Sequence, residues 1–136
     1  MIVVVTGPPL AGKSTHIKLN AKPGDVIIDM DELALALTTS DAQAHAYSEQ
    51  VRAIAIEARK AAVKEALYQC ADRRGPTAWI IHTDPTPDER SQYRLRNAQF
   101  VNLNPGKEVC LERLKSRPEV SQPLAKKVIN DYYQKR

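Results

Sequence analysis

Short apolar segments alternate with longer segments of helical periodicity along the whole chain. The apolar segments are rich in β-branched or aromatic residues and are bounded by turn residues, which is typical of buried strands. We expect strands at residues 2–6, 26–29, 77–82 and 99–103. Because strands that alternate with helices form βαβ units, the pattern predicts an α/β fold with a mostly parallel sheet of about four to five strands flanked by helices.

The intervening segments carry apolar residues at spacings of three and four, which predicts helices. Two segments have start signals, because Ser40 with Gln43 and Thr86 with Glu89 match the capping box. Pro118 separates the last two helices, since proline cannot continue a helix. We expect helices at residues 13–19, 41–71, 87–97, 106–117 and from 121 onward.

Length and composition indicate a single domain over residues 1–136, because the chain is long enough for one core and too short for two ordinary domains. No apolar run approaches the roughly 20 residues of a membrane span, and the apolar start lacks the features of a signal peptide. We therefore expect a cytoplasmic protein without membrane contact, with Cys70 and Cys110 as reduced thiols. The net charge of +4 selects no partner by itself.

A glycine-rich segment lies between the first predicted strand and the first predicted helix. It reads Gly7-Pro8-Pro9-Leu10-Ala11-Gly12-Lys13-Ser14-Thr15 and matches the P-loop pattern G-x-x-x-x-G-K-[ST]. Gly7 and Gly12 permit backbone amides to curl around a phosphate. We expect Lys13 on the β- and γ-phosphates, Ser14 on Mg²⁺ and Thr15 on the α-phosphate. The segment predicts a three-layer P-loop NTPase or kinase fold that binds ATP, or another NTP, with Mg²⁺; the alternative is a glycine turn that binds nothing.

Acidic residues follow the second predicted strand, where the C-terminal ends of parallel strands surround a ligand crevice. They lie in the run Asp29-Met30-Asp31-Glu32-Leu33. A carboxylate there can accept the proton of an attacking hydroxyl or hold Mg²⁺, so we favour Asp31 as the base, with Asp29 as a second candidate and a metal contact. The alternative is that Asp31 only caps the next helix and Glu32 supports its first turn. After the third predicted strand, Asp84 is a candidate for a water-mediated metal contact.

Three segments together resemble a known family. They are the phosphate-loop segment 7–15, the acidic segment 29–33 and a late basic helix, Val109-Cys110-Leu111-Glu112-Arg113-Leu114-Lys115-Ser116-Arg117-Pro118. Over nearly its whole length the chain resembles the P-loop kinases related to phage polynucleotide kinase and zeta-toxin kinases. The resemblance is greatest to small phage-encoded members that are often labelled AAA-type ATPases.

The resemblance implies a kinase core and roles for three residues. Asp31 matches the position that activates the acceptor hydroxyl. A lid-like helical segment around residues 106–120 matches the family's lid, in which Arg113 and Arg117 neutralise the transferring phosphate. The chain departs from the polynucleotide-kinase pattern at Ala34, where an arginine is common, and this puts a contact with a nucleotide 3′-phosphate in question.

Several basic residues have two interpretations. Arg113 and Arg117 lie four residues apart and can point into one site from one helical face, but the same helix is charged all round and can equally face water. Arg52 and Arg59 either bind an acidic acceptor or face water, and His82 fits a satisfied strand-end residue as well as a site residue. No metal-ligand spacing relates the three histidines, His16, His45 and His82.

The leading functional hypothesis is an ATP-dependent phosphotransferase that moves the γ-phosphate to a hydroxyl of a nucleoside, nucleotide, nucleic-acid end or modified base. The first alternative is a P-loop NTPase that hydrolyses ATP as a switch or in assembly with a partner. The second is a nucleotide-binding module without chemistry. The sequence leaves the acceptor open, and we expect a monomer or small homo-oligomer.

Overall fold

The computed structural model describes residues 1–39, 41–42 and 46–136. One or two helices follow each strand in these ranges, with a 3₁₀ turn between the last two, and no helix in them is both long and apolar enough to cross a membrane. In chain order the elements are β1 (Ile2–Thr6), α1 (Lys13–Asn20), β2 (Val26–Ile28), α2 (Met30–Ala36), α3 (Glu49–Gln69), β3 (Ala78–Ile81), α4 (Pro87–Leu95), β4 (Gln99–Asn102), α5 (Lys107–Leu114), the 3₁₀ turn η1 (Glu119–Ser121) and α6 (Gln122–Gln134).

The described strands form one four-stranded sheet with the order β2-β3-β1-β4, and every neighbouring pair is parallel. β1 lies inside the sheet, where Val4 pairs with Ile80 of β3 and with Phe100 of β4. All residues of β1 are buried, as expected for a strand covered on both faces. The predicted α/β fold with a parallel sheet is confirmed, and each strand lies within the range that the apolar segments predicted.

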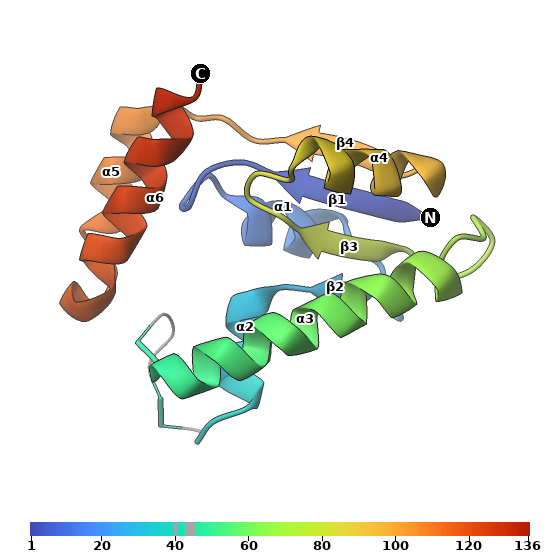
Figure 1. Cartoon of the computed structure of the whole chain (residues 1–136), viewed down its shortest axis with the longest axis horizontal. Helices are drawn as coiled ribbons and strands as arrows, with labels where there is room; N and C mark the ends of the chain where they lie inside the picture. The colour runs from blue at the N-terminus through green and yellow to red at the C-terminus, as the bar shows by residue number, and fades with distance from the viewer. Residues whose placement is uncertain (40, 43–45) are drawn as a thin grey trace.

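Helices cover both faces of the sheet (Figure 1). On one face, Val4 of β1 belongs to a buried cluster with Ala66 of α3 and Tyr93 of α4. On the other face, Val5 of β1 packs with Ile17 of α1. Because successive side chains of a strand point to opposite faces, β1 is held by both layers, and it leads directly into the glycine-rich segment.

α5 and α6 form a hairpin beyond the C-terminal ends of the strands (Figure 1). Cys110 and Leu114 of α5 pack with Ala125 and Ile129 of α6 in a buried cluster. Leu10, from the segment after β1, packs against the same cluster. The α5–α6 hairpin therefore lies at the edge of the sheet where parallel α/β folds bind their ligands.

The long helix begins later than predicted. α3 starts at Glu49 and not at residue 41, and the Ser48 side chain accepts a hydrogen bond from an amide of its first turn at 3.2 Å. Ser48 thereby satisfies one of the amides that lack a partner within the helix, which fixes the start there. The predicted capping pair, Ser40 with Gln43, lies outside the described residues.

Two other helix starts are fixed by side-chain caps. The short helix α2 was expected only in the alternative interpretation of Asp31 as a cap, and Asp29 caps it by accepting a hydrogen bond from the Asp31 amide at 3.0 Å. The cap after β2 is therefore Asp29 and not Asp31. The predicted capping box before α4 is confirmed, because Thr86 Oγ1 accepts from the Glu89 amide at 3.2 Å and Glu89 Oε1 accepts from the Thr86 amide at 3.0 Å.

Candidate functional site

The segment between β1 and α1, here called the glycine loop (residues 7–15), has a tightly turned backbone. The φ angles of Gly7, Leu10 and Gly12 are 140°, 66° and 95°, in the left-handed region that favours glycine. A Cβ atom at position 7 would lie 2.3 Å from the Leu103 carbonyl oxygen, so a larger residue does not fit there without a backbone shift. The glycine loop thus turns sharply from a buried strand to the N-terminus of α1.

Lys13 lies inside the glycine loop. Its Nζ donates hydrogen bonds to the carbonyl oxygens of Gly7 at 2.8 Å and Pro8 at 2.6 Å, and the residue is only 9% exposed. Burial, followed by the positive charge of Arg117, lowers the pKa of Lys13 from 10.5 to about 8. The side chain remains mostly protonated at pH 7, so the loop holds a positive charge at neutral pH.

A series of polar contacts joins α1 to the start of α2. Ser14 Oγ donates a hydrogen bond to Asp29 Oδ2 at 3.1 Å, while Asp29 Oδ1 accepts the hydrogen bond from the Asp31 amide. Asp29 is buried and is oriented by both contacts. The negative charges of Asp29 and Asp31 also raise the pKa of Lys13, and all three residues line the same cleft. The structure therefore brings together the predicted cation, metal ligand and acids.

Tyr47 joins this site, although the sequence did not indicate it. Its hydroxyl donates a hydrogen bond to Asp31 Oδ1. Burial and this hydrogen bond raise the pKa of the Tyr47 hydroxyl, whereas the positive charge of Arg52 acts in the opposite direction. The sequence pattern places Tyr47 on the apolar stripe of a long helix. The structure instead places it before α3, and nothing in the sequence pattern signals its contact with Asp31.

The two predicted lid arginines do not share a helical face, because α5 ends at Leu114 and Arg117 lies in the turn after it, and they have different partners. Arg113 is exposed, and its Nη1 donates a hydrogen bond to the Leu10 carbonyl at 2.9 Å. Arg117 is half-buried; burial lowers its pKa, while the charge of Asp31 acts most strongly in the opposite direction. Arg113 is thus hydrogen-bonded to the backbone of the glycine loop, and Arg117 interacts electrostatically with Asp31 and Asp29.

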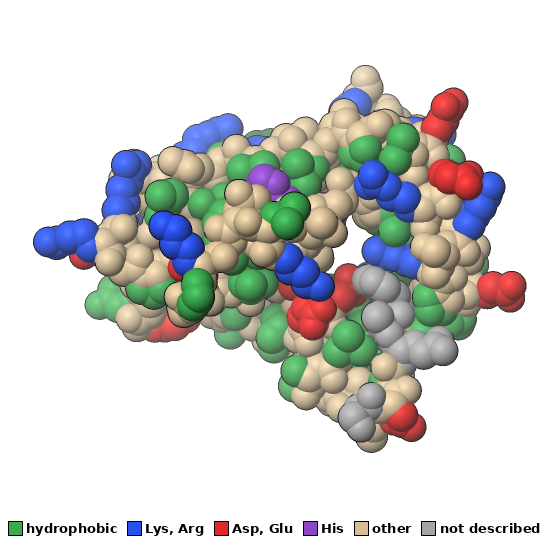
Figure 2. Space-filling model, turned by 180° about the vertical axis from the view of Figure 1, so that it is seen from behind, with side chains coloured by type: hydrophobic (Ala, Val, Ile, Leu, Met, Phe, Trp, Pro, Cys, Tyr) green, Lys and Arg blue, Asp and Glu red, His purple; other side chains and the backbone are tan. Residues whose placement is uncertain are grey.

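These groups line an open cleft of about 1760 Å³. Its walls are the glycine loop, the start of α2, the first half of α3 and the α5–α6 hairpin, and Arg52 and Arg59 also line it. The face shown in Figure 2 is hollowed, and basic and acidic side chains gather at the hollow. A pocket for one small ligand measures roughly 300–1,000 Å³, so the cleft has room for two ligands.

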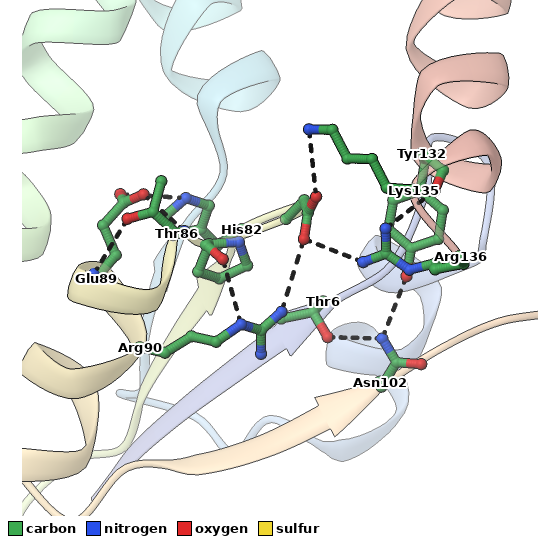
Figure 3. A network of polar contacts seen from close by, with 11 residues as sticks. Thr6, His82, Thr86, Glu89, Arg90, Asn102, Tyr132, Lys135 and Arg136 are labelled. Carbon is green, nitrogen blue, oxygen red and sulfur yellow. Dashed lines mark hydrogen bonds and ion pairs between the residues drawn. The ribbon is translucent and has the colours of Figure 1, made fainter.

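Asp84, the other predicted metal contact, lies at the same cleft among cations. Its carboxylate oxygens lie 3.0 Å from Arg136, 3.7 Å from Arg90 and 3.9 Å from Lys135. In Figure 3, Arg90 and Arg136 point toward one another from α4 and from just beyond α6. These three cations compensate the carboxylate charge, and a metal contact for Asp84 stays a prediction.

His82 and Arg59 both have partners in the fold. His82 Nδ1 lies 2.9 Å from the Tyr93 hydroxyl, and its Nε2 lies 3.4 Å from the Glu89 carboxylate. Burial, followed by the charge of Arg59, lowers the pKa of His82, so the imidazole is mostly neutral at pH 7. Arg59 Nη2 donates a hydrogen bond to the Ile81 carbonyl at 2.9 Å. These contacts favour the interpretation of His82 as a satisfied strand-end residue and give Arg59 a role in holding α3 against β3.

Among the described residues, no group of three His, Cys, Asp or Glu side chains could hold a metal ion. These residues therefore offer no ligand set for a resident metal centre. His45, one of the three histidines, lies outside them. A Mg²⁺ ion that arrives with a nucleotide is a different case, because one or two protein ligands suffice when phosphates and water supply the rest.

No protein-family model matches the chain, and no curated protein sequence matches it significantly. The functional interpretation therefore depends on the motifs and on the geometry of the site. Of the predicted nucleotide contacts, Gly7 and Pro8 are buried in the turn. The others line the cleft: Pro9, Leu10, Ala11, Gly12, Lys13, Ser14 and Thr15.

Proposed function

We propose that the chain is a P-loop phosphotransferase that moves the γ-phosphate of ATP to a hydroxyl group. The observation that supports this most is the contact series from Ser14 through Asp29 to Asp31, next to the Lys13 ammonium. Phosphoryl transfer needs a cation on the phosphates, a place for Mg²⁺ and a group that receives the acceptor proton. The site has a residue for each task, at the C-terminal ends of parallel strands.

In this proposal the glycine loop binds the phosphates. The amides at the start of α1 and the dipole of that helix favour an anion. Lys13 exchanges its contacts with the Gly7 and Pro8 carbonyls for phosphate oxygens. Because the ammonium is buried, its attraction to a phosphate is screened less than at the surface.

Ser14 and Asp29 fit the Mg²⁺ ion that accompanies the nucleotide. A hydroxyl and a carboxylate oxygen 3.1 Å apart are the hard oxygen ligands that Mg²⁺ prefers. The other Asp29 oxygen accepts a hydrogen bond from the Asp31 amide, so the carboxylate is oriented before any ion binds. When bound, the ion supplies charge neutralisation at the transferring phosphate.

Asp31 fits the general base better than Asp29. Asp29 uses one oxygen for Ser14 and the other to cap α2. The Asp31 carboxylate makes neither of these contacts; it lines the cleft and accepts a hydrogen bond from the Tyr47 hydroxyl, which is the kind of contact that a base makes with an acceptor before proton transfer. Arg117, whose charge interacts with Asp31, is placed to stabilise negative charge that develops in the transition state.

An NTPase would use the same groups with water as the attacking molecule. The open cleft of about 1760 Å³ leaves space for an acceptor beside the nucleotide, which is compatible with transfer. Arg52 lines that volume near Tyr47 and gives the acceptor side of the cleft a positive charge.

Transfer of labelled γ-phosphate to a panel of acceptors tests the proposal. The panel holds 5′-hydroxyl DNA and RNA ends, nucleosides and modified-base DNA. We expect one class to be labelled and Lys13→Ala to reduce the rate by at least about 100-fold. Lys18→Ala, an exposed lysine on α1 outside the cleft, is the matched control and should keep the rate. Free phosphate without a labelled acceptor would support the NTPase, and no turnover at all would contradict the proposal.

A further inference from the structure

The Tyr47 hydroxyl takes the position at Asp31 that an acceptor hydroxyl would occupy. Tyr47 precedes α3 and lines the same cleft as Lys13 and Ser14. Its hydroxyl donates a hydrogen bond to Asp31 Oδ1. In the proposed phosphotransferase, Asp31 receives the proton of the acceptor. The chain therefore holds a hydroxyl of its own against the base, in the cleft where the nucleotide would bind.

Two arginines add positive charge around this hydroxyl. The charge of Arg52 acts on Tyr47, and Arg117 interacts with both Asp31 and Tyr47. Arg52 lies in α3 and Arg117 in the turn after α5, and both line the cleft. A phosphotyrosine carries a charge of about −1.5 to −2 at pH 7, and arginine side chains bind phosphate oxygens in pairs of hydrogen bonds. The two arginines thus offset the charge of a phosphorylated side chain, which would also lie beside the carboxylates of Asp31 and Asp29.

We propose that Tyr47 is a phosphoryl acceptor within its own chain, so that the protein phosphorylates this tyrosine. The inference rests on the proposed function and names one acceptor for the same site. A bond forms between Tyr47 Oη and the γ-phosphorus of ATP, and the bond from that phosphorus to the β,γ-bridging oxygen breaks. The phenolic proton passes to Asp31, ADP leaves, and Asp31 later releases the proton to water.

Intact-mass spectrometry after incubation with Mg·ATP, without an added acceptor, tests this inference. We expect the wild-type chain to gain one phosphate, and peptide fragmentation to place it on Tyr47. Because donor site and acceptor lie in one chain, the fraction labelled per unit time should stay constant over an about tenfold range of protein concentration. Tyr47→Phe should gain no phosphate. Tyr68→Phe removes a tyrosine of α3 that is 71% exposed and lies outside the cleft, and this matched control should be labelled like the wild type.

Binding of Mg·ATP, measured as a rise in melting temperature, provides a readout without turnover. Tyr47→Phe should keep this rise, because the substitution leaves the glycine loop intact. If Tyr47→Phe does not fold, the position of the phosphate in the wild-type chain still decides the question.

Three results would overturn the inference. Phosphate on a residue other than Tyr47 would do so. The inference would also be overturned if an external acceptor were labelled, or ADP were formed, while Tyr47 stayed unmodified. Tyr47 would then be a residue that positions Asp31 in a working phosphotransferase. The absence of both nucleotide binding and turnover would overturn the proposed function, and the self-phosphorylation with it.

Discussion

The Lys13 ammonium has two backbone carbonyls as hydrogen-bond partners and is almost fully buried. Burial of a charge in surroundings that compensate it only partly is unfavourable, and for Lys13 this appears as a pKa lowered to about 8. An anion that enters the glycine loop removes part of that cost. At the scale of the residue, the loop is therefore an anion site that carries its cation before any ligand binds.

The lowered pKa of Lys13 predicts a change of stability at alkaline pH. Its folded-state value of about 8 lies below the value of 10.5 for a free lysine, so the unfolded chain binds more protons between the two. The contribution of Lys13 to stability is thus present above pH 10.5 and is lost as the pH falls through about 8. Relative to Lys13→Met, the wild type should gain roughly 2 to 3 kcal/mol of unfolding free energy between about pH 7 and about pH 10.

Urea unfolding of both chains at the two pH values measures this difference. Lys18→Met, an exposed position on the same helix, is the control and should show little dependence. The difference in unfolding free energy between the wild type and Lys13→Met should therefore change with pH. If this difference were the same at both pH values, that result would contradict a buried ammonium in the glycine loop.

The site residues differ in how far the sequence predicted them. Lys13 and Ser14 lie in a motif whose local spacing fixes their geometry, whereas Asp29 was predicted because it follows a strand of a parallel sheet, and the structure brings the three together. Tyr47 could not be predicted, because its contact with Asp31 depends on the path of the chain before α3 and spans 16 positions. Periodicity assigns a tyrosine to a helical stripe, but it does not show where that helix begins.

At the scale of the elements, the strands were predictable and the helix starts only partly so. Each strand lies in a short apolar segment between turn residues, and that pattern located it, whereas the order β2-β3-β1-β4 was not predicted. The start of a helix depends on which of several polar side chains accepts a hydrogen bond from a backbone amide of the first turn. Thr86 and Glu89 were recognisable because both halves of a capping box are present. Ser48 was not distinguished from the earlier serine at position 40.

Asp29 has two tasks, as the cap of α2 and as the partner of Ser14, and substitutions can separate them. Asparagine is a good N-cap, so Asp29→Asn should keep stability within a few tenths of a kcal/mol, while Asp29→Ala should lose about 1 kcal/mol. Both changes remove the negative charge and should weaken the Mg²⁺-dependent part of ATP binding. Thermal unfolding and ATP titration at several Mg²⁺ concentrations measure the two effects. If Asp29→Asn binds Mg·ATP like the wild type, Asp29 has no part in holding the ion.

At the scale of the whole molecule, polar contacts hold the α5–α6 hairpin against the ends of the strands. Asn102 Nδ2 donates hydrogen bonds to Thr6 Oγ1 at 2.9 Å and to the Tyr132 hydroxyl at 3.4 Å (Figure 3). Arg136 stacks on the Tyr132 ring at 3.6 Å and pairs with Asp84. The wall of the cleft that carries Arg113 and Arg117 is thus tied to β1 and β4 and to the segment after β3. Such long-range contacts join residues far apart in the sequence, and no local pattern predicts them.

This arrangement predicts a structural rather than a metal-binding role for Asp84. Asp84→Asn removes the charge that pairs with Arg90, Lys135 and Arg136, and it should lower the free energy of unfolding by at most about 1 kcal/mol, because these pairs are partly exposed. The Mg²⁺ dependence of ATP binding should not change. Asp131→Asn, an exposed acid of α6, is the control. A Mg²⁺ dependence that shifts with Asp84→Asn alone would instead support the metal contact that the sequence suggested.

The central claim is that the cleft binds Mg·ATP through the glycine loop, and isothermal titration calorimetry tests it most directly. The wild-type chain should bind ATP with Mg²⁺ and bind it more weakly without the ion. Lys13→Ala should weaken binding by at least about 30-fold, because a buried charge partner of the phosphates is lost. Lys18→Ala should bind like the wild type. Absence of ATP binding by the wild-type chain, or equal binding by Lys13→Ala, would contradict the account.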